Sequence, residues 1–136
     1  MFNAKLRRMK KLLIIGLILI TGVFYGCREK YITYDNNGET IHLMVDQVLK
    51  VALPSNASTG NDWRKTAYDD KIIDRLGKPN YMLSDGRTGS PGVTNFRFKA
   101  IKEGESKLYL EYGNKYKSEK EPEKIFEVTV IVIPKR

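Results

Sequence analysis

The chain has a single histidine, His42, and a single cysteine, Cys27, among its 136 residues. One cysteine excludes an intramolecular disulfide, and one residue of each type is too few for the usual zinc clusters. His42 lies within an apolar strand pattern, where a structural role is expected. Neither a Cys–His nor a Ser–His–Asp catalytic arrangement is therefore predicted. The sequence predicts that the protein is not an enzyme and that it needs no cofactor and no metal.

A strong excess of positive charge is also absent once the N-terminal segment is set aside. The whole chain has 24 basic and 16 acidic residues, but five of the basic residues lie within residues 1–26. The remaining 19 basic and 16 acidic residues leave a net charge of only +3. The lysines of residues 115–124 alternate with glutamates, which is typical of a solvated loop rather than of a phosphate-binding track. A nucleic-acid partner is not expected.

Residues 1–26 have the pattern of a secretory signal peptide. Basic residues are followed by an uncharged apolar stretch, Leu12–Tyr25, and then by Gly26. The alternative is a transmembrane anchor, but a helix of this length spans about 21 Å, and a hydrocarbon core is about 30 Å thick. The pattern favours a signal peptide at 1–26, followed by a short tether at 27–37 and one folded domain at 38–136.

Cys27 follows this segment directly, and Phe24-Tyr25-Gly26-Cys27 resembles the lipobox of bacterial lipoproteins. The resemblance implies that lipid is attached to Cys27 and anchors the secreted protein to a membrane. Arg28 after the cysteine resembles the signal for sorting to the outer membrane or cell surface. The alternative is cleavage of an ordinary signal peptide nearby, with Cys27 incidental.

The rest of the chain has the periodicity of β-strands. Apolar runs or period-2 alternation predict strands at 41–45, 48–53, 95–101, 106–112 and 124–133. Only residues 69–76 could form a helical turn, which Gly77-Lys78-Pro79 would end. Short strands at regular spacing around a single tryptophan predict an all-β fold, an immunoglobulin-like antiparallel β-sandwich. A monomer is expected.

Three loops between these strands have unusual compositions. They span residues 54–62, 84–92 and 113–123, and they are rich in Gly, Ser, Asn and charged residues. Loops of a sandwich that are separated by suitable numbers of strands emerge at the same end. Three such loops on a rigid frame would form a binding edge.

At these loops the sequence resembles the chagasin-like inhibitors of papain-family cysteine proteases. The family has a loop Asn-Pro-Thr-Thr-Gly-Tyr-x-Trp, and Asn56, Thr59, Gly60 and Trp63 match it at the same spacing. Gly89-Ser90-Pro91-Gly92 stands where the family has a glycine-rich loop. In the third loop, Asn114 and Lys115 replace the Arg-Pro of the family, and Tyr116 keeps its aromatic residue. The resemblance covers residues 38–134.

The resemblance implies a reversible, competitive inhibitor that wedges three loops into the active-site cleft of a papain-family protease. Thr59 would lie nearest to the catalytic residues of the protease, and Trp63 would pack inward beneath the loop. The residues that would bind the protease are Asn56, Ala57, Ser58, Thr59, Gly60, Gly89, Ser90, Pro91, Gly92, Asn114 and Tyr116.

Two other functions remain open from the residues alone. An immunoglobulin-like surface lipoprotein could bind a carbohydrate or another protein, for which a patch of exposed loop aromatics would be expected. A structural protein of the cell envelope could carry the same loops as solvated turns.

Overall fold

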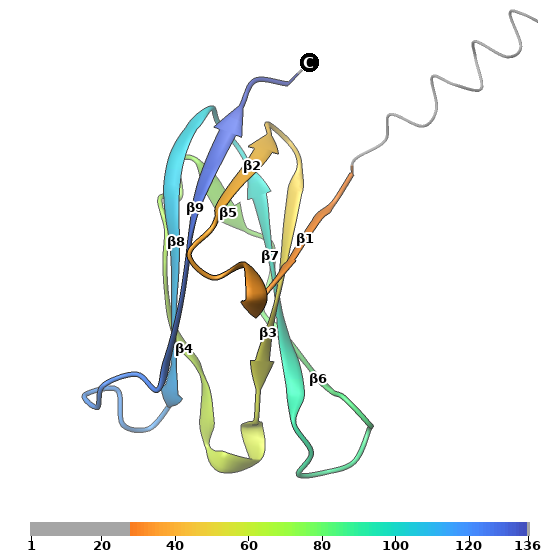
Figure 1. Cartoon of the computed structure of the whole chain (residues 1–136), viewed down its shortest axis with the longest axis vertical. Helices are drawn as coiled ribbons and strands as arrows, with labels where there is room; N and C mark the ends of the chain where they lie inside the picture. Colours follow the sequence, from red (N-terminus) through yellow and green to blue (C-terminus); the bar gives the residue numbers. More distant parts are fainter. Residues whose placement is uncertain (1–27, 136) are drawn as a thin grey trace, which may run out of the picture.

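The computed structural model describes residues 28–135, which form a two-layered β-sandwich (Figure 1). The predicted signal peptide and Cys27 lie outside the described residues. One sheet has β1 (Lys30–Thr33), β3 (Val48–Ser55), β7 (Gly92–Ala100) and β5 (Ile73–Arg75), with β6 (Asn80–Leu83) also paired to β7. The other has the order β2 (Thr40–Met44), β9 (Lys124–Ile133), β8 (Gly104–Asn114) and β4 (Asn61–Ala67). The predicted all-β sandwich is confirmed.

Alternating apolar residues of both sheets fill the core between the layers. Along β7 the side chains of Phe96 and Phe98 point inward, and the intervening Arg97 is exposed. Leu108 and Leu110 of β8 face them from the other layer and are fully buried. Because the period of a strand is two, this alternation places one apolar face of each sheet on the core.

Two pairs at the edges of the sheets are parallel, so both sheets are mixed. β1 runs parallel to β3, and β2 runs parallel to β9, whereas the other pairs are antiparallel. A parallel pair needs a connection longer than a hairpin. Between β1 and β3 the chain crosses to the other sheet through the short 3₁₀ helix η2 (Tyr34–Asn36) and forms β2 there. Between β2 and β9 lie all the other strands from β3 to β8. The predicted antiparallel sandwich thus has, in addition, one parallel pair at an edge of each sheet.

The tether predicted at 27–37 is replaced in part by a strand of the sandwich. β1 pairs with β3, and its Ile32 is only 1% exposed within the core. Tyr34 packs on the core as well, with its ring centroid 6.4 Å from that of Trp63. A single buried residue in a four-residue strand produces no visible alternation, so the sequence pattern did not show this strand.

The segment 69–76, which the sequence allowed as a helical turn, forms a turn only in its first half. The chain turns once after Asp69, whose carbonyl accepts hydrogen bonds from the N–H groups of Ile72 and Ile73. It then continues as β5, with Ile73 fully buried and paired to Ala100. Pairing with β7 therefore decides the conformation of a segment whose local sequence is ambiguous.

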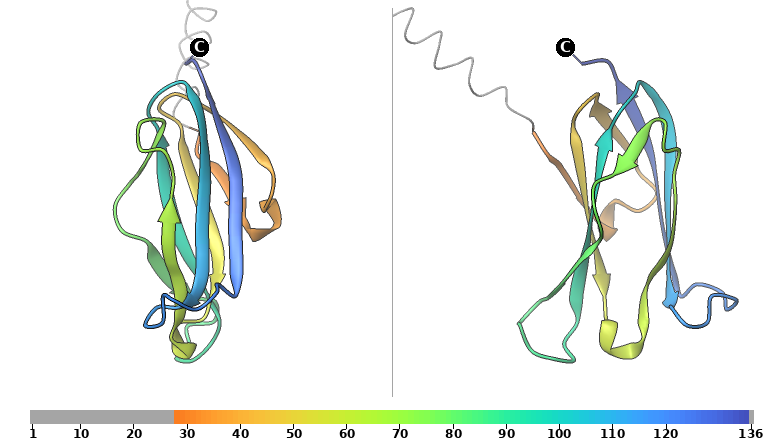
Figure 2. Two further views of the ribbon diagram at one scale, coloured as in Figure 1. Left: turned by 90° about the vertical axis from the view of Figure 1, so that its left-hand side faces the viewer. Right: turned by 180° about the vertical axis from the view of Figure 1, so that it is seen from behind.

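The connections β3–β4, β6–β7 and β8–β9 lie at one end of the sandwich, and the C-terminus lies at the other (Figures 1 and 2). We call residues 56–60 loop 1, residues 84–91 loop 2 and residues 115–123 loop 3. Loop 1 lies between the other two, because Ser55 pairs with Gly92 on one side and Asn61 pairs with Asn114 on the other. The predicted gathering of three loops at one end is confirmed.

The helices within residues 28–135 are single short turns, none of which could span a lipid bilayer.

The burial of Ile32 predicts that β1 stabilises the domain. Ile32→Ala should lower the free energy of unfolding by about 2–5 kcal/mol, because it removes buried methyl groups and leaves a cavity. Urea denaturation followed by tryptophan fluorescence measures this change. The neighbouring Tyr31 is 62% exposed, so Tyr31→Ala should change stability by less than about 0.5 kcal/mol. Equal stabilities of the wild type and Ile32→Ala would show that the segment is a tether.

Candidate functional site

Loop 1 is a compact turn whose side-chain hydroxyls are used within the loop. Ala57–Thr59 form the 3₁₀ turn η3, and Gly60 closes it with a φ of 79°, a conformation that favours glycine. The Thr59 hydroxyl donates to the Asn56 carbonyl at 2.7 Å, and the Ser58 hydroxyl donates to the Asn56 side-chain oxygen at 2.6 Å. The loop therefore has a defined shape before any partner is bound.

Trp63 and Tyr112 join loop 1 to the core. Trp63 is only 7% exposed, and its indole N–H donates to the Pro54 carbonyl at 3.1 Å. Its ring centroid lies 5.1 Å from that of Tyr112, and the Tyr112 hydroxyl accepts a hydrogen bond of 3.0 Å from the Asn56 N–H. The start of the loop is thus held by aromatic side chains from β4 and β8. The predicted inward packing of Trp63 is confirmed.

Loop 2 is held mainly by hydrogen bonds within itself. The Ser84 N–H donates to the Pro91 carbonyl at 3.1 Å, and the Arg87 N–H donates to the Asp85 carboxylate at 3.0 Å. A hydrogen bond from the Ser90 hydroxyl, together with that from the Arg87 N–H, holds the pKa of the Asp85 carboxyl below its ordinary value. At neutral pH the Asp85 carboxyl is therefore charged, and it accepts the hydrogen bonds that close the turn inside loop 2.

Gly92 lies at the base of loop 2 and is buried. A Cβ atom at this position would lie 2.4 Å from the Met82 carbonyl oxygen and 2.8 Å from the ring of Tyr81. Only glycine fits such a close approach of backbone. This crowding gives Gly92 a structural role at the base of loop 2, and its contact with a protease stays a prediction.

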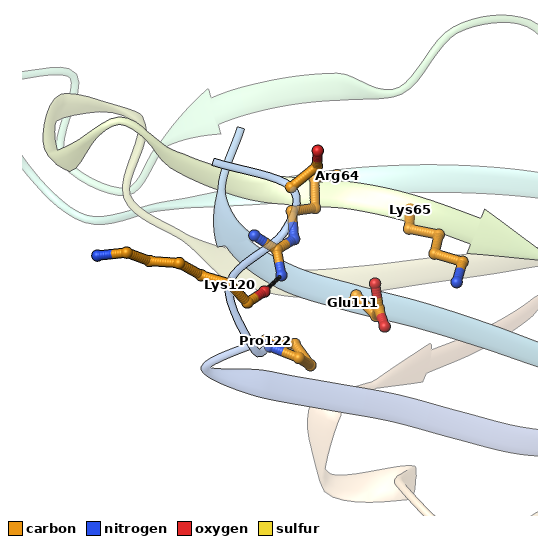
Figure 3. Close-up of a pocket in the computed structure, with 6 residues that line it drawn as sticks. Arg64, Lys65, Glu111, Lys120 and Pro122 are labelled. Atoms are coloured by element: carbon orange, nitrogen blue, oxygen red, sulfur yellow. Dashed lines mark hydrogen bonds between the residues drawn. The ribbon is translucent and has the colours of Figure 1, made fainter. Parts of the chain in front are cut away.

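Loop 3 displays the most exposed large hydrophobic residue of the described chain. Tyr116 is 79% exposed, and the Lys115 ammonium lies 5.2 Å from the centre of its ring. The Asn114 side chain accepts a hydrogen bond from the Tyr116 N–H at 2.9 Å, so Asn114 shapes the turn before the tyrosine. Beneath this loop lies a pocket of about 390 Å³ (Figure 3), lined by Arg64, Lys65, Glu111, Ser118, Lys120 and Pro122.

Loops 1 and 3 are linked to each other directly. The Lys115 N–H donates to the Gly60 carbonyl at 3.2 Å. The Asn61 side-chain amide donates to both oxygens of the Glu123 carboxylate, at 3.0 and 3.1 Å. Loops 1 and 3 therefore form a connected unit. Loop 2 is joined to loop 1 through the pairing of β3 with β7.

The structure brings the predicted site residues together at one end of the sandwich but not all at its surface. Asn56, Gly60, Ser90 and Asn114 are half-buried. The exposed members are Ala57, Ser58, Thr59, Gly89, Pro91 and Tyr116. Sequence reasoning missed Tyr112 and Arg64, which support loops 1 and 3 from the strands. Tyr112 ends a clear alternating strand, but no local pattern indicates that its hydroxyl reaches loop 1.

The chemistry of this edge is that of a binding surface. Residues 28–135 hold no group of three or more His, Cys, Asp or Glu side chains placed to bind a metal ion. The exposed end of loop 1 consists of small side chains, and the loops beside it present a turn and an aromatic ring. Loops that a rigid frame positions are common places for binding residues.

The sequence model of the chagasin family peptidase inhibitor I42 matches residues 42–130. The chain therefore belongs to the chagasin family, which consists of protein inhibitors of cysteine proteases, and it is an inhibitor rather than an enzyme. Comparison with curated protein sequences found no match.

Solved structures of similar fold include two proteins with about one fifth of their residues identical to this chain. The cysteine protease inhibitor EhICP2 from Entamoeba histolytica has a TM-score of 0.67 at 21% identity, over 77% of this chain and 95% of its own. Amebosin has a TM-score of 0.53 at 21% identity, over 78% of this chain and 99% of its own. At this level of identity the likeness supports the fold.

The contact between Tyr112 and Asn56 predicts a specific effect on loop 1. Tyr112→Phe removes the hydroxyl and leaves the Asn56 N–H without its acceptor, at a cost of about 1–2 kcal/mol. Amide hydrogen exchange should show faster exchange at Asn56. Tyr109→Phe is the matched control, because the Tyr109 hydroxyl bonds to Glu111 at the surface instead. Unchanged exchange at Asn56 in Tyr112→Phe would contradict the proposed support.

Proposed function

We propose that this protein inhibits papain-like cysteine proteases reversibly and competitively by inserting loops 1, 2 and 3 into the active-site cleft. The observation that carries the proposal is the form of loop 1. Ser58 and Thr59 are exposed at the end of a rigid sandwich, in a chain that belongs to a family of cysteine protease inhibitors. Loop 1 stands between two companion loops, as a central wedge would.

The physical chemistry of the cleft suits such a loop. A papain-like protease has a groove with a reactive thiolate at its floor, so an inhibitor must be narrow there and must not offer a well-placed scissile carbonyl. Ser58, Thr59 and Gly60 have little side-chain bulk, which allows their backbone to approach the thiolate. Because the hydroxyls of Ser58 and Thr59 are bonded within the loop, little order has to be gained on binding.

The companion loops would extend the contact along the groove. Loop 2 offers a turn with Gly89 and Pro91 exposed, and loop 3 offers the ring of Tyr116. An aromatic residue of this kind is a common anchor of protein interfaces. Interfaces of standard size bury about 800 Å² per partner, which is sufficient for tight non-covalent inhibition. The inhibitor would act as a monomer and without a cofactor.

The alternative of a carbohydrate-binding surface lipoprotein lacks the aromatic patch that it requires. Tyr116 is the one large hydrophobic residue within loops 1 to 3 that is strongly exposed. Tyr81 next to loop 2 is half-buried, and its hydroxyl donates to the Ser90 carbonyl at 3.5 Å. Inhibition accounts better for a preformed central loop of small residues between two companion loops.

Lipid attachment at Cys27 remains part of the proposal, and the position of β1 is compatible with it. Lys30 pairs with Leu49 near the start of β3, whereas loop 1 follows the end of β3. Glu29 contacts Lys50 at 2.5 Å and Arg97 at 3.3 Å, and the Lys50 ammonium lowers the pKa of the Glu29 carboxyl. An anchor at residue 27 would therefore leave the three loops facing away from the outer membrane.

Inhibition of papain tests the proposed function. Residues 28–136, which contain the whole core, should lower the initial rate of papain at micromolar concentration without being consumed. Thr59→Trp should abolish inhibition, since the indole fills the space above the thiolate, and should leave the melting temperature nearly unchanged. Glu103→Trp is the control, because Glu103 is exposed in the turn between β7 and β8 at the opposite end. Absence of inhibition by the wild type would overturn the proposal.

Fractionation of cells tests the proposed anchor. In a bacterium with two membranes, the full chain should sediment with the membranes, and mass spectrometry should find lipid on an N-terminal Cys27. Cys27→Ser should move the protein to the soluble fraction or leave it unprocessed, because the acyl chains provide the membrane affinity. Arg28→Gln keeps the cysteine and should still carry lipid. A mature protein that begins at a residue other than Cys27 and carries no lipid would refute lipid attachment.

A further inference from the structure

Loop 3 is held in place by a side chain from outside the loop. Where the family motif has Arg-Pro, this chain has Asn114-Lys115. The Arg64 guanidinium, from β4, donates hydrogen bonds to backbone carbonyls at the end of β8 and in loop 3. Figure 3 shows the one to Lys120. Arg64 is half-buried between the sheet and the loop.

A β-bulge explains how Arg64 reaches this position. Trp63 pairs with Tyr112 and Lys65 pairs with Glu111, so Arg64 is the extra residue between two consecutive pairs. A bulge disrupts the alternation of the strand and re-aims its side chain. After the bulge Lys65 is exposed, although it lies two residues after the buried Trp63.

The guanidinium contacts three carbonyl groups along the loop. One terminal nitrogen donates to the carbonyls of Asn114, at 3.2 Å, and Lys117, at 2.8 Å. The other terminal nitrogen donates to the carbonyl of Lys120. Arginine has a planar, rigid fork of donors, which a lysine ammonium lacks. One side chain thus spans the loop from residue 114 to residue 120.

Gly113 provides the space that this arrangement requires. A Cβ atom at Gly113 would lie 3.0 Å from the central carbon of the Arg64 guanidinium and 3.1 Å from one of its terminal nitrogens. A larger residue would therefore crowd the guanidinium in its position against the loop. Within residues 28–135 no carboxylate forms an ion pair with Arg64, so its polar contacts are directed to the loop.

We propose that Arg64 is a positioning residue that fixes loop 3, and that the affinity for a papain-like protease depends on it through Tyr116. The second part rests on the function proposed above. Without the guanidinium, loop 3 would have to be ordered during binding, and the entropy lost would weaken the complex. Arg64 itself need not touch the protease.

Hydrogen exchange and inhibition of papain by residues 28–136 test this proposal together. In Arg64→Gln, the hydrogen-bonded amides of Lys115, Tyr116, Lys117 and Lys120 should exchange at least about tenfold faster, while the amides of β7 and β9 stay protected. The inhibition constant for papain should rise about 10- to 100-fold with little change in melting temperature. Arg64→Lys should recover only part of the affinity. Lys65→Gln, an exposed neighbour on the same strand, should behave as the wild type.

A double-mutant cycle tests the route through Tyr116. Tyr116→Ala should weaken inhibition strongly in the wild type and much less in the Arg64→Gln background, because the ring is then already misplaced. Additive effects would overturn the claim that Arg64 acts through Tyr116. Gly113→Ala keeps Arg64 and places a methyl group 3.0 Å from the centre of its guanidinium. It should produce a smaller loop-selective change in exchange than Arg64→Gln.

The outcomes separate this proposal from the proposed function. If the wild type fails to inhibit papain, the function fails, and loop-selective exchange in Arg64→Gln still decides whether Arg64 fixes loop 3. If the wild type inhibits and Arg64→Gln has the same exchange or the same inhibition constant, the positioning role is refuted. Loss of global stability without a loop-selective change would refute it as well.

Discussion

The aromatic junction between Trp63 and Tyr112 is the contact on which the binding edge depends. Each residue has its ring in the core and its polar group at the base of loop 1: the indole N–H bonds to Pro54, and the phenolic oxygen accepts from Asn56. The packing of the core and the shape of the loop are therefore set by the same two side chains. Displacing either ring would alter both the stability and the loop.

The three loops are held in different ways, which has consequences for binding. Loop 1 is held from the core, and loop 3 is held by Arg64 and by its bonds to Gly60 and Asn61. Loop 2 depends on its own hydrogen bonds and on the crowded backbone at Gly92. Loops 1 and 3 should therefore respond together to a partner, whereas loop 2 can vary in length or sequence with less effect on the others.

Prediction from sequence succeeded where a strand is long and buried on one face. β7, β8 and β9 alternate clearly, since each has several inward residues, and their positions were predicted within a few residues. β1, β5 and β6 are short edge strands with at most one fully buried residue, so they show no periodicity. β4 was missed for a different reason, because the bulge at Arg64 shifts its alternation halfway along.

The sequence by itself determined the all-β class, the positions of the long strands and the motif that marks loop 1, because period-2 burial and turn residues are local properties. Only the tertiary structure decided that residues 30–33 belong to the domain, that Gly92 is buried, and that Arg64 supports loop 3. These facts depend on pairing and packing between residues distant in the chain. No local sequence pattern indicates them, because each residue acquires its role through a contact with a residue of another strand or loop.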